Sequence, residues 1–384
     1  MTGARQKTGP MRLLALSPVP AEGAGCRFRV LQYVPALERA GFSVTVAPFF
    51  DAPFFDMVYQ PGHYAQKFRA LVRQSVERLR LVTTRDRYDA FFVYREAYPI
   101  GPALLETLLA RSVGRPLVYD FDDAIFLNNS SDANRIVSAL KYPQKVASII
   151  RRSTLVLAGN EYLAGYARAH NSNVAVLPTC VDTTVFAPRT TPAPPDATPV
   201  IGWIGTHSTT RYLKSLAAPL RRLAATDKFV LRLSGTAEPV SLDGVATVEE
   251  PWRMDREVEL FNTCDIGVYP LPDDEWARGK CGFKAIQFMA CGVPVVAAAV
   301  GVNREIIQDG VNGFLASSPQ EWTAALKRLI ADPELRRRIG AAGRRTIEER
   351  YSLAVHAPRL ASFLSEVAGR GRPAGRPATG AHDG

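Results

Sequence analysis

Short apolar segments alternate with longer amphipathic segments along most of the chain. The first six predicted strands are Arg12–Ser17, Ser43–Ala47, Ala90–Tyr94, Pro116–Asp120, Thr154–Ala158 and Val174–Leu177. The next six are Val200–Ile204, Phe229–Leu233, Ala246–Val248, Asp265–Tyr269, Pro294–Ala299 and Phe314–Ala316. Helical periodicity lies between them, for example over Phe28–Ala40, Tyr64–Leu81 and Pro102–Leu109. This alternation predicts an α/β protein with two doubly wound, Rossmann-like domains.

A proline-rich segment, PRTTPAPPDATP at 188–199, separates the two series of strands. Proline lacks an N–H donor and fixes φ, so this segment suits neither a helix nor a strand interior. The predicted division is a flexible N-terminus (1–10), a first domain (11–188), a linker (189–199), a second domain (200–350), a C-terminal helix that packs back on the first domain (351–368) and a disordered tail (369–384). We expect ligands in the cleft where the carboxyl ends of the strands face each other.

Composition narrows the possible classes of protein. The chain has 384 residues, 47% of them hydrophobic, and no window resembles a membrane span of ~20 apolar residues. Five cysteines without a CxxC pair suit a reducing cytoplasm. The net charge of +10 suits phosphate-bearing ligands or an anionic membrane surface. No nucleic-acid-binding motif is present, so we expect no nucleic acid partner.

The segment RGKCGFKAIQFMACGVPVV at 278–296 suggests an anion site. A helix beginning near Gly282 places Lys284, Gln287 and Cys291 on one face, which we expect to point away from the core. Lys280 lies just before the first turn, where free N–H groups favour anions. The pattern therefore predicts either a diphosphate pocket or an ordinary surface helix with solvated lysines.

Longer motifs resemble family 4 (group 1) glycosyltransferases of the GT-B fold. The segment CGFKAIQFMACGVPVVAAAVGVNREIIQDGVNGFL at 281–315 resembles the family's donor-site segment. GNEYLAGYARAHNSNVAVLPTCVDTTVFAP at 159–188 is similar to the segment that closes the first domain. CDIGVYPL at 264–271 and IGWIGTHSTTRYL at 201–213 resemble two further segments in the same order. The resemblance covers roughly residues 11 to 350 and is strongest in the second half.

This resemblance implies transfer of a sugar, with retention, from a nucleotide diphosphate sugar to an acceptor hydroxyl. It implies no cofactor, a saccharide or lipid-linked acceptor, and a role in cell envelope polysaccharide. The DFDD segment at 120–123 also resembles the D-x-D metal motif of the other large glycosyltransferase fold. The two α/β series favour the metal-free GT-B site, in which lysine, arginine and helix dipoles neutralise the diphosphate.

The family motifs can be placed on this chain residue by residue. The family's two donor-helix glutamates fall at Gly279 and Gln287, so one side chain is missing and the other is uncharged. The family's Arg and Lys after the first strand of the second domain fall at Thr206 and Arg211. The expected donor-binding residues are Gly205, Thr206, His207, Arg211, Lys280, Lys284, Gln287, Val302, Asn303 and Glu305.

The first domain is expected to hold the acceptor and the reaction centre. The expected catalytic residues are Asp120, Asp122, Lys280 and Lys284, with either aspartate alternatively a helix cap. The expected acceptor-binding residues are Arg27, Arg29, Arg95 and Glu96, with Arg27 and Arg29 alternatively facing solvent.

Other functions remain open at this point. A nucleotide-sugar epimerase, a hydrolase or a non-catalytic nucleotide-sugar-binding protein would share the fold. An NAD-dependent oxidoreductase is disfavoured because no G-x-G-x-x-G follows the first strand. Tyr64–Leu81 is a basic amphipathic segment. We favour a solvated crossover helix there, and contact with the inner face of an anionic membrane by an otherwise cytoplasmic protein is the alternative.

Overall fold

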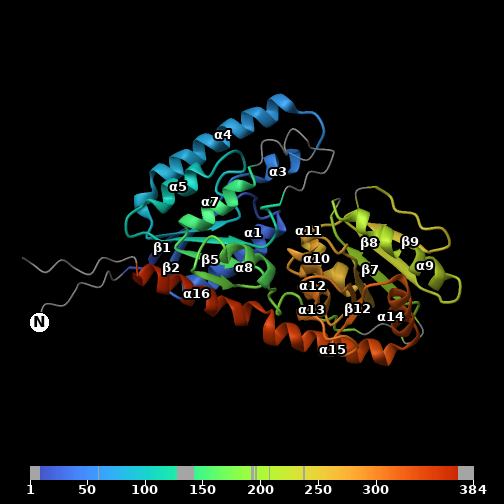
Figure 1. The fold of residues 1–384 in the computed structure, drawn as a ribbon. Coiled ribbons are helices and arrows are strands. Elements are labelled where there is room, and N and C mark those ends of the chain that lie inside the picture. Colours follow the sequence, from blue (N-terminus) through green and yellow to red (C-terminus); the bar gives the residue numbers. More distant parts are fainter. Residues whose placement is uncertain are drawn as a thin grey trace, which may run out of the picture.

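The structure is a computed structural model that describes residues 9–370 except 59, 128–141, 192–193, 195–196, 207 and 237. Most of the predicted flexible N-terminus and disordered tail, part of the linker, and His207 lie outside the described residues. The described chain forms two sheets of six parallel strands each, with helices on both faces (Figure 1). The predicted fold class is confirmed.

The strands agree with the apolar segments to within two residues at each end. The first sheet has the order β2-β1-β3-β4-β5-β6 and the second β12-β11-β10-β7-β8-β9. The first sheet comprises β1 (Met11–Ser17), β2 (Phe42–Pro48), β3 (Ala90–Tyr94), β4 (Leu117–Phe121), β5 (Leu155–Ala158) and β6 (Val174–Val176). The second comprises β7 (Val200–Ile204), β8 (Val230–Ser234), β9 (Thr247–Glu250), β10 (Ile266–Tyr269), β11 (Val295–Ala298) and β12 (Phe314–Ala316).

The helices up to α13 lie between successive strands, and α14 and α15 follow the last strand, β12. The first domain has α1 (Ala24–Arg29), α2 (Val34–Arg39), α3 (Ala52–Val58), α4 (Tyr64–Thr83), α5 (Leu104–Ala110), α7 (Gln144–Arg152) and α8 (Glu161–Arg168). The second has the 3-10 helix η4 (Thr210–Leu216), α9 (Ala217–Ala224), α10 (Glu257–Asn262), α11 (Glu275–Arg278), α12 (Phe283–Ala290), α13 (Asn303–Ile306), α14 (Pro319–Ala331) and α15 (Pro333–Arg350).

One helix that was predicted to be continuous is broken in the structure. The segment Phe28–Ala40 was expected to be a single helix, but α1 ends at Arg29 and α2 begins at Val34. Val30 has φ −127° and ψ −67°, outside the helical region, and Pro35 stands in the first turn of α2. Proline at that position costs no hydrogen bond, whereas in a continuous helix it would remove one.

The last helix, α16 (Leu353–Arg370), returns to the first domain. Its apolar residues Ala357, Leu360, Leu364 and Val367 are buried in one cluster with Leu13 and other residues of the first sheet. Figure 1 shows α15 and α16 running in succession along the base of both domains. Within the described residues, no helix combines the length and the apolar character needed to cross a membrane.

Candidate functional site

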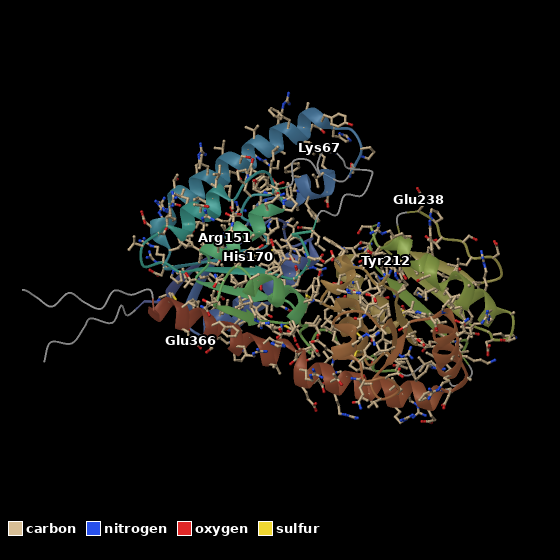
Figure 2. The ribbon with its side chains drawn as sticks, viewed as in Figure 1. Lys67, Arg151, His170, Tyr212, Glu238 and Glu366 are labelled. Carbon is tan, nitrogen blue, oxygen red and sulfur yellow. The ribbon has the colours of Figure 1, made fainter. Side chains whose placement is uncertain are left out.

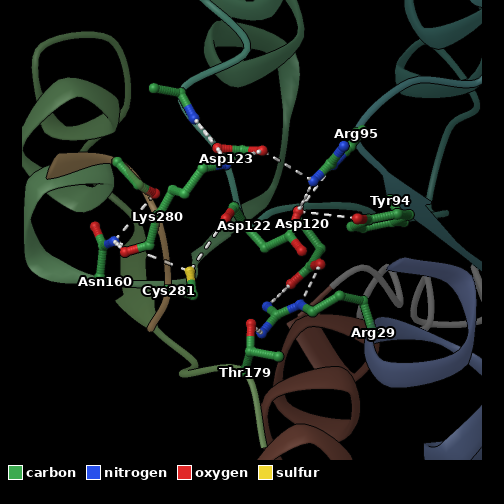
Figure 3. Close-up of polar contacts among 12 residues, drawn as sticks. Arg29, Tyr94, Arg95, Asp120, Asp122, Asp123, Asn160, Thr179, Lys280 and Cys281 are labelled. Atoms are coloured by element: carbon green, nitrogen blue, oxygen red, sulfur yellow. Dashed lines mark hydrogen bonds and ion pairs between the residues drawn. The ribbon is translucent and has the colours of Figure 1, made fainter. Parts of the chain in front are cut away.

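The two domains touch along a seam formed by loops at the carboxyl ends of their strands. Asn160, which follows β5, donates from Nδ2 to the carbonyl oxygens of Gly279 (3.2 Å) and Lys280 (3.0 Å). The Cys281 thiol donates to the carbonyl oxygen of Asp122 across 3.1 Å (Figure 3). The segment before α12 is thereby held by hydrogen bonds to residues that follow β4 and β5 of the first domain.

An ionic network lies on the first-domain side of this seam. Asp122 accepts from the Tyr94 hydroxyl at 2.9 Å and from Arg95 Nε at 2.8 Å. Asp123 lies 3.6 Å from Arg95 Nη2 and 3.5 Å from Lys280 Nζ (Figure 3). Arg95 has φ +57°, a left-handed conformation that is unusual for a side-chain-bearing residue and recurs at functional sites.

The network keeps Asp122 ionised. Burial alone would raise the pKa of Asp122, but the charges of Arg95 and Arg29 and the hydrogen bonds from Arg95 and Tyr94 outweigh it and lower the pKa. Lys280 has Asp123 as a close counter-charge, so its positive charge is largely neutralised within the seam. Asp122 therefore places a fixed negative charge just after the carboxyl end of β4.

Asp120 lies behind this network, in the core of the first domain. Its carboxylate forms a bidentate ion pair with Arg29, which also donates from Nη1 to the carbonyl oxygen of Leu177 at 2.8 Å. Both side chains are fully enclosed. This burial corrects the expectation that Asp120 and Arg29 contact a substrate, because the pair fastens α1 to β4 inside the protein.

Glu96 also has an internal partner. Its carboxylate lies 2.5 Å from the Nζ of buried Lys145 on α7, which donates in addition to the carbonyl oxygen of Tyr98 at 2.8 Å. Arg95 is partly exposed and faces the seam, so it remains available to an acceptor.

A second charged group lies at the head of α12 and joins the two domains. Arg27 of α1 reaches across the seam and pairs with Glu257 of α10, with 2.7 Å between Nη1 and Oε2. Glu257 Oε1 accepts from Gln287 Nε2 at 3.1 Å and lies 3.9 Å from Lys284 Nζ. Lys284 Nζ donates to Gln287 Oε1 at 2.8 Å. We call Arg27, Glu257, Lys284 and Gln287 the seam cluster.

The seam cluster carries two cations and one carboxylate in a buried setting. Burial lowers the pKa of Lys284 to about 8, against the opposing effect of Glu257, and Arg27 lowers it further. The Nε and Nη2 atoms of Arg27 are buried and have no hydrogen-bond partner among the described residues. The cluster therefore has an excess positive charge and two guanidinium nitrogen atoms without hydrogen-bond partners among the described residues.

Gln287 and Glu257 differ from the sequence-based prediction. The face with Lys284, Gln287 and Cys291 was expected to point away from the core, which is wrong, because Gln287 and Cys291 are fully buried. Gln287 uses both ends of its amide on Glu257 and Lys284, so it does not face a ligand. Glu257 was missed because it stands in the charged segment RMDRE, a pattern typical of a solvated surface.

Gly279 has a structural reason to lack a side chain. A Cβ atom built at Gly279 would lie 2.5 Å from the Cβ of Ala124 in the first domain, far inside van der Waals contact. The backbone before α12 can approach the first domain only with glycine at this position. The position that carries a glutamate in the family is here a point of close contact between the domains.

A cavity of about 340 Å³ opens beside this contact. Its lining comes from both domains and includes Asn160, Tyr162, Asp273, Arg278, Val302 and Glu305. Val302 and Glu305 were expected to bind the donor, and they line a space of the size of a small ligand site. Asn303 does not reach it: it is fully buried and donates to the carbonyl oxygen of Ala298 at 2.9 Å.

The remaining expected donor residues belong to the loop after β7. Gly205 and Thr206 begin this loop, and Thr206 is bonded to Thr209 through its backbone N–H at 3.0 Å. Arg211 is exposed, with its guanidinium 5.2 Å from the centroid of the Tyr212 ring. A hydrogen bond to the Tyr212 hydroxyl raises the pKa of Arg211. No contact joins Arg211 to Lys280 or Lys284 within the described residues.

Comparison with known proteins identifies relatives of part of the chain. Residues 198–332 match the family described as Glycosyl transferases group 1. A D-inositol 3-phosphate glycosyltransferase from Thermobifida fusca is 32% identical over 113 residues, which are 29% of this chain and 25% of that protein. One from Stackebrandtia nassauensis is 30% identical over 209 residues, 47% of this chain and 46% of that protein. The matches thus span less than half of either relative.

Solved structures resemble nearly the whole chain. Sucrose-phosphate synthase from Thermosynechococcus elongatus has a TM-score of 0.67 at 17% identity, over 94% of this chain and 100% of that chain. Anabaena Alr3699/HepE in complex with UDP-glucose has a TM-score of 0.64 at 19% identity, over 93% and 100% of the two chains. The predicted GT-B fold and the predicted resemblance to group 1 glycosyltransferases are confirmed.

Proposed function

We propose that this chain, whose second domain matches the group 1 glycosyl transferases, transfers a sugar from a nucleotide diphosphate sugar to an acceptor hydroxyl. The observation that carries the proposal is the seam cluster. It places two cations at the start of α12, opposed by one carboxylate among the described residues, and two guanidinium nitrogen atoms of Arg27 have no hydrogen-bond partner there. A diphosphate group supplies the charge and the acceptor oxygens that this arrangement lacks.

In this proposal, the two charged groups of the seam have separate roles in the transfer. When the bond between the sugar and the diphosphate breaks, negative charge develops on the diphosphate, and Arg27 and Lys284 stabilise it. The sugar gains positive charge at the same moment. The ionised carboxylate of Asp122, fixed by Arg95 and Tyr94, is the group that stabilises this positive charge.

Several finer features belong to the same proposal. The reaction retains the anomeric configuration, with the leaving diphosphate taking the acceptor proton on the same face of the sugar. The acceptor is a saccharide or a lipid-linked saccharide used in cell envelope polysaccharide. The protein works in the cytoplasm, in peripheral contact with the inner face of the membrane. Anabaena Alr3699/HepE was solved with UDP and with UDP-glucose, which makes uridine nucleotides the first to examine.

A thermal-shift comparison tests the proposal. UDP, GDP, ADP and TDP and their sugars are added to the wild-type chain, to Lys284→Ala and to Arg27→Ala. Lys228→Ala serves as the control, because Lys228 is exposed at the amino end of β8, the edge of the sheet opposite the seam. Stabilisation by one nucleotide diphosphate that is lost in both seam variants and kept in the control supports the proposal. Stabilisation by none of them contradicts it.

A second function is favoured by one observation. The close contact between Gly279 and Ala124 occupies a position at which the family resemblance implies a glutamate that contacts the donor sugar. A nucleotide-sugar epimerase, a hydrolase or a binding protein without turnover would tolerate this change. Product analysis with the nucleotide sugar that stabilises the chain separates these outcomes: release of free nucleotide without an acceptor indicates hydrolysis, a changed sugar indicates an epimerase, and an unchanged donor indicates a binding protein.

A further inference from the structure

Helix α4 is amphipathic, but it is turned with its apolar face outward. Its residues Tyr64, Phe68, Val72, Val76 and Leu79 have exposed fractions between 44% and 80%. They are spaced by four, four, four and three residues, so at ~100° per residue they form one stripe along the helix. At ~1.5 Å per residue, the 20 residues of α4 extend this stripe over roughly 30 Å.

The side of α4 that packs on the domain carries polar residues along its middle, and apolar Leu81 and Val82 pack into the core only at its end. Gln74 and Arg78 are almost completely buried. Gln74 Nε2 donates to Asp51 at 2.8 Å, and Arg78 Nη2 donates to the carbonyl oxygen of Ala47 at 2.9 Å. These bonds tie α4 to the carboxyl end of β2. A crossover helix with a water-facing polar side would show the reverse arrangement, so the prediction of a solvated crossover helix is wrong for this face.

A row of cations borders the apolar stripe. Arg69, Arg73 and Arg80 are exposed and project from neighbouring angles on one side of the stripe. Arg73 pairs with Asp51, whereas neither Arg69 nor Arg80 forms an ion pair within the described part of the chain. Glu77 is the single acidic residue of α4. The helix therefore combines a continuous apolar stripe with unneutralised positive charge, in a chain with a net charge of +10.

The position of α4 in the fold leaves this face accessible. Figure 1 shows α4 along the outer edge of the first domain, and Figure 2 shows its side chains projecting away from the domain around Lys67. The other exposed large apolar residues are scattered over both domains. Isolated exposed apolar residues are normal, whereas a contiguous stripe of this length marks an interaction surface.

We propose that the stripe of α4 docks the protein on an anionic phospholipid membrane, with the helix lying in the plane of the interface. The apolar side chains enter the boundary between headgroups and acyl chains, and Arg69 and Arg80 meet lipid phosphates. A second copy of this chain fits the surface less well, because it would bring one row of arginines against another. The inference names the surface responsible for the peripheral contact included in the proposed function.

Vesicle co-sedimentation of the full chain tests this inference. Vesicles of phosphatidylcholine alone are compared with vesicles that also contain phosphatidylglycerol, at low and at high salt. We expect binding to the anionic vesicles that weakens at high salt, because screening reduces the attraction of the arginines. Phe68→Ser with Leu79→Ser should weaken binding by at least ~10-fold. Arg69→Gln with Arg80→Gln should weaken it on the order of 30-fold, from the loss of ~1 kcal/mol per arginine.

The matched control is Val248→Ser with Val311→Ser, two similarly exposed apolar residues of the second domain, and it should bind as the wild type does. All substituted side chains are exposed, so the variants should keep the wild-type melting temperature. Failure of the wild type to bind anionic vesicles overturns the inference, as does binding that the α4 variants leave unchanged. A dimer in light scattering that Phe68→Ser with Leu79→Ser dissolves would show that a second copy occupies the face. None of these results depends on sugar transfer, so the docking inference and the proposed function fail separately.

Discussion

From the geometry of the seam cluster, we predict that exchanging the carboxylate of Glu257 on α10 with the amide of Gln287 on α12 is tolerated better than either substitution alone. Glu257→Gln removes the single negative charge beside Lys284 and Arg27. Removing one partner of a buried ion pair costs about 3–5 kcal/mol, because the remaining charge is left buried without its partner. Gln287→Glu instead adds a carboxylate to a site that already holds one.

The cost of Gln287→Glu follows from the distances in the cluster. A carboxylate oxygen in place of Gln287 Nε2 would lie 3.1 Å from Glu257, a repulsion of about 5 kcal/mol at an effective dielectric constant of about 20. Attraction to Lys284 at 2.8 Å is about as large and of opposite sign. The net cost is then that of burying one additional charge, which is several kcal/mol.

The double substitution, Glu257→Gln with Gln287→Glu, keeps one carboxylate and one amide between the same neighbours. It still lacks the ion pair of Arg27, as Glu257→Gln does, but it restores a carboxylate beside Lys284 and removes the repulsion present in Gln287→Glu. We therefore expect the double variant to be more stable than either single variant, with a coupling free energy of at least ~2 kcal/mol.

Calorimetry of the wild type and the three variants at one pH measures this coupling. A change of 1 kcal/mol shifts the melting temperature of a domain of this size by about 2–4 °C. The melting temperature should fall in both single variants and recover in the double variant. Additive effects, within ~0.5 kcal/mol, would refute the reasoning, because they would mean that residues 257 and 287 do not share one electrostatic site.

Four further predictions concern the seam and the buried ion pair behind it. The affinity for a nucleoside diphosphate should fall as the pH is raised through about 8, because Lys284 loses its proton there, and calorimetric titrations should show no such step in Lys284→Ala. The pKa of Lys284 in the folded chain lies below its usual value of 10.5, so between about pH 8 and pH 10.5 the unfolded chain binds one more proton than the folded chain. Urea denaturation should therefore show that the contribution of Lys284 to the free energy of unfolding rises over this pH range. Asp120→Asn should destabilise the chain by about 3–5 kcal/mol and leave the dissociation constant of the nucleotide unchanged, since Asp120 serves Arg29 in the core; a changed dissociation constant at unchanged stability would contradict this. Gly279→Ala should separate the domains or cost about 1–3 kcal/mol, because its methyl group meets Ala124, and an increased radius of gyration in small-angle scattering or a lowered melting temperature would report it.

The strands were predictable because of where they lie. Strands of a parallel sheet covered on both faces are buried on both sides, so β3 and β4 appear in the sequence as nearly continuous apolar runs. The break between α1 and α2 was also signalled, by Pro35. The apolar residues keep a 3.6-residue periodicity across this proline, so periodicity alone predicts one continuous helix there.

The direction in which a helix faces was not predictable from its own residues. The stripe of α12 was identified correctly, but its polar face is buried because Glu257 receives Gln287 and Lys284. In α4, the polar residues Gln74 and Arg78 are likewise buried because they donate hydrogen bonds to Asp51 and to the carbonyl oxygen of Ala47. These hydrogen-bond partners lie outside the helix in question. The amphipathic spacing of a helix therefore defines its apolar and polar faces, but it does not determine which face packs against the rest of the protein. Asp120 is a similar case, since its partner Arg29 stands 91 positions earlier.

The return of α16 to the first domain has a consequence for biosynthesis. Leu360 and Leu364 fill a cluster whose other members, such as Leu13, belong to the first strands to be made. A ribosome must therefore translate the entire second domain before the last apolar residues of the first become available. Domains usually fold in the order of their synthesis, with the N-terminal one first. Here the core of the first domain can be completed only after the second domain has been synthesised, so the two domains cannot reach their final packing strictly one after the other.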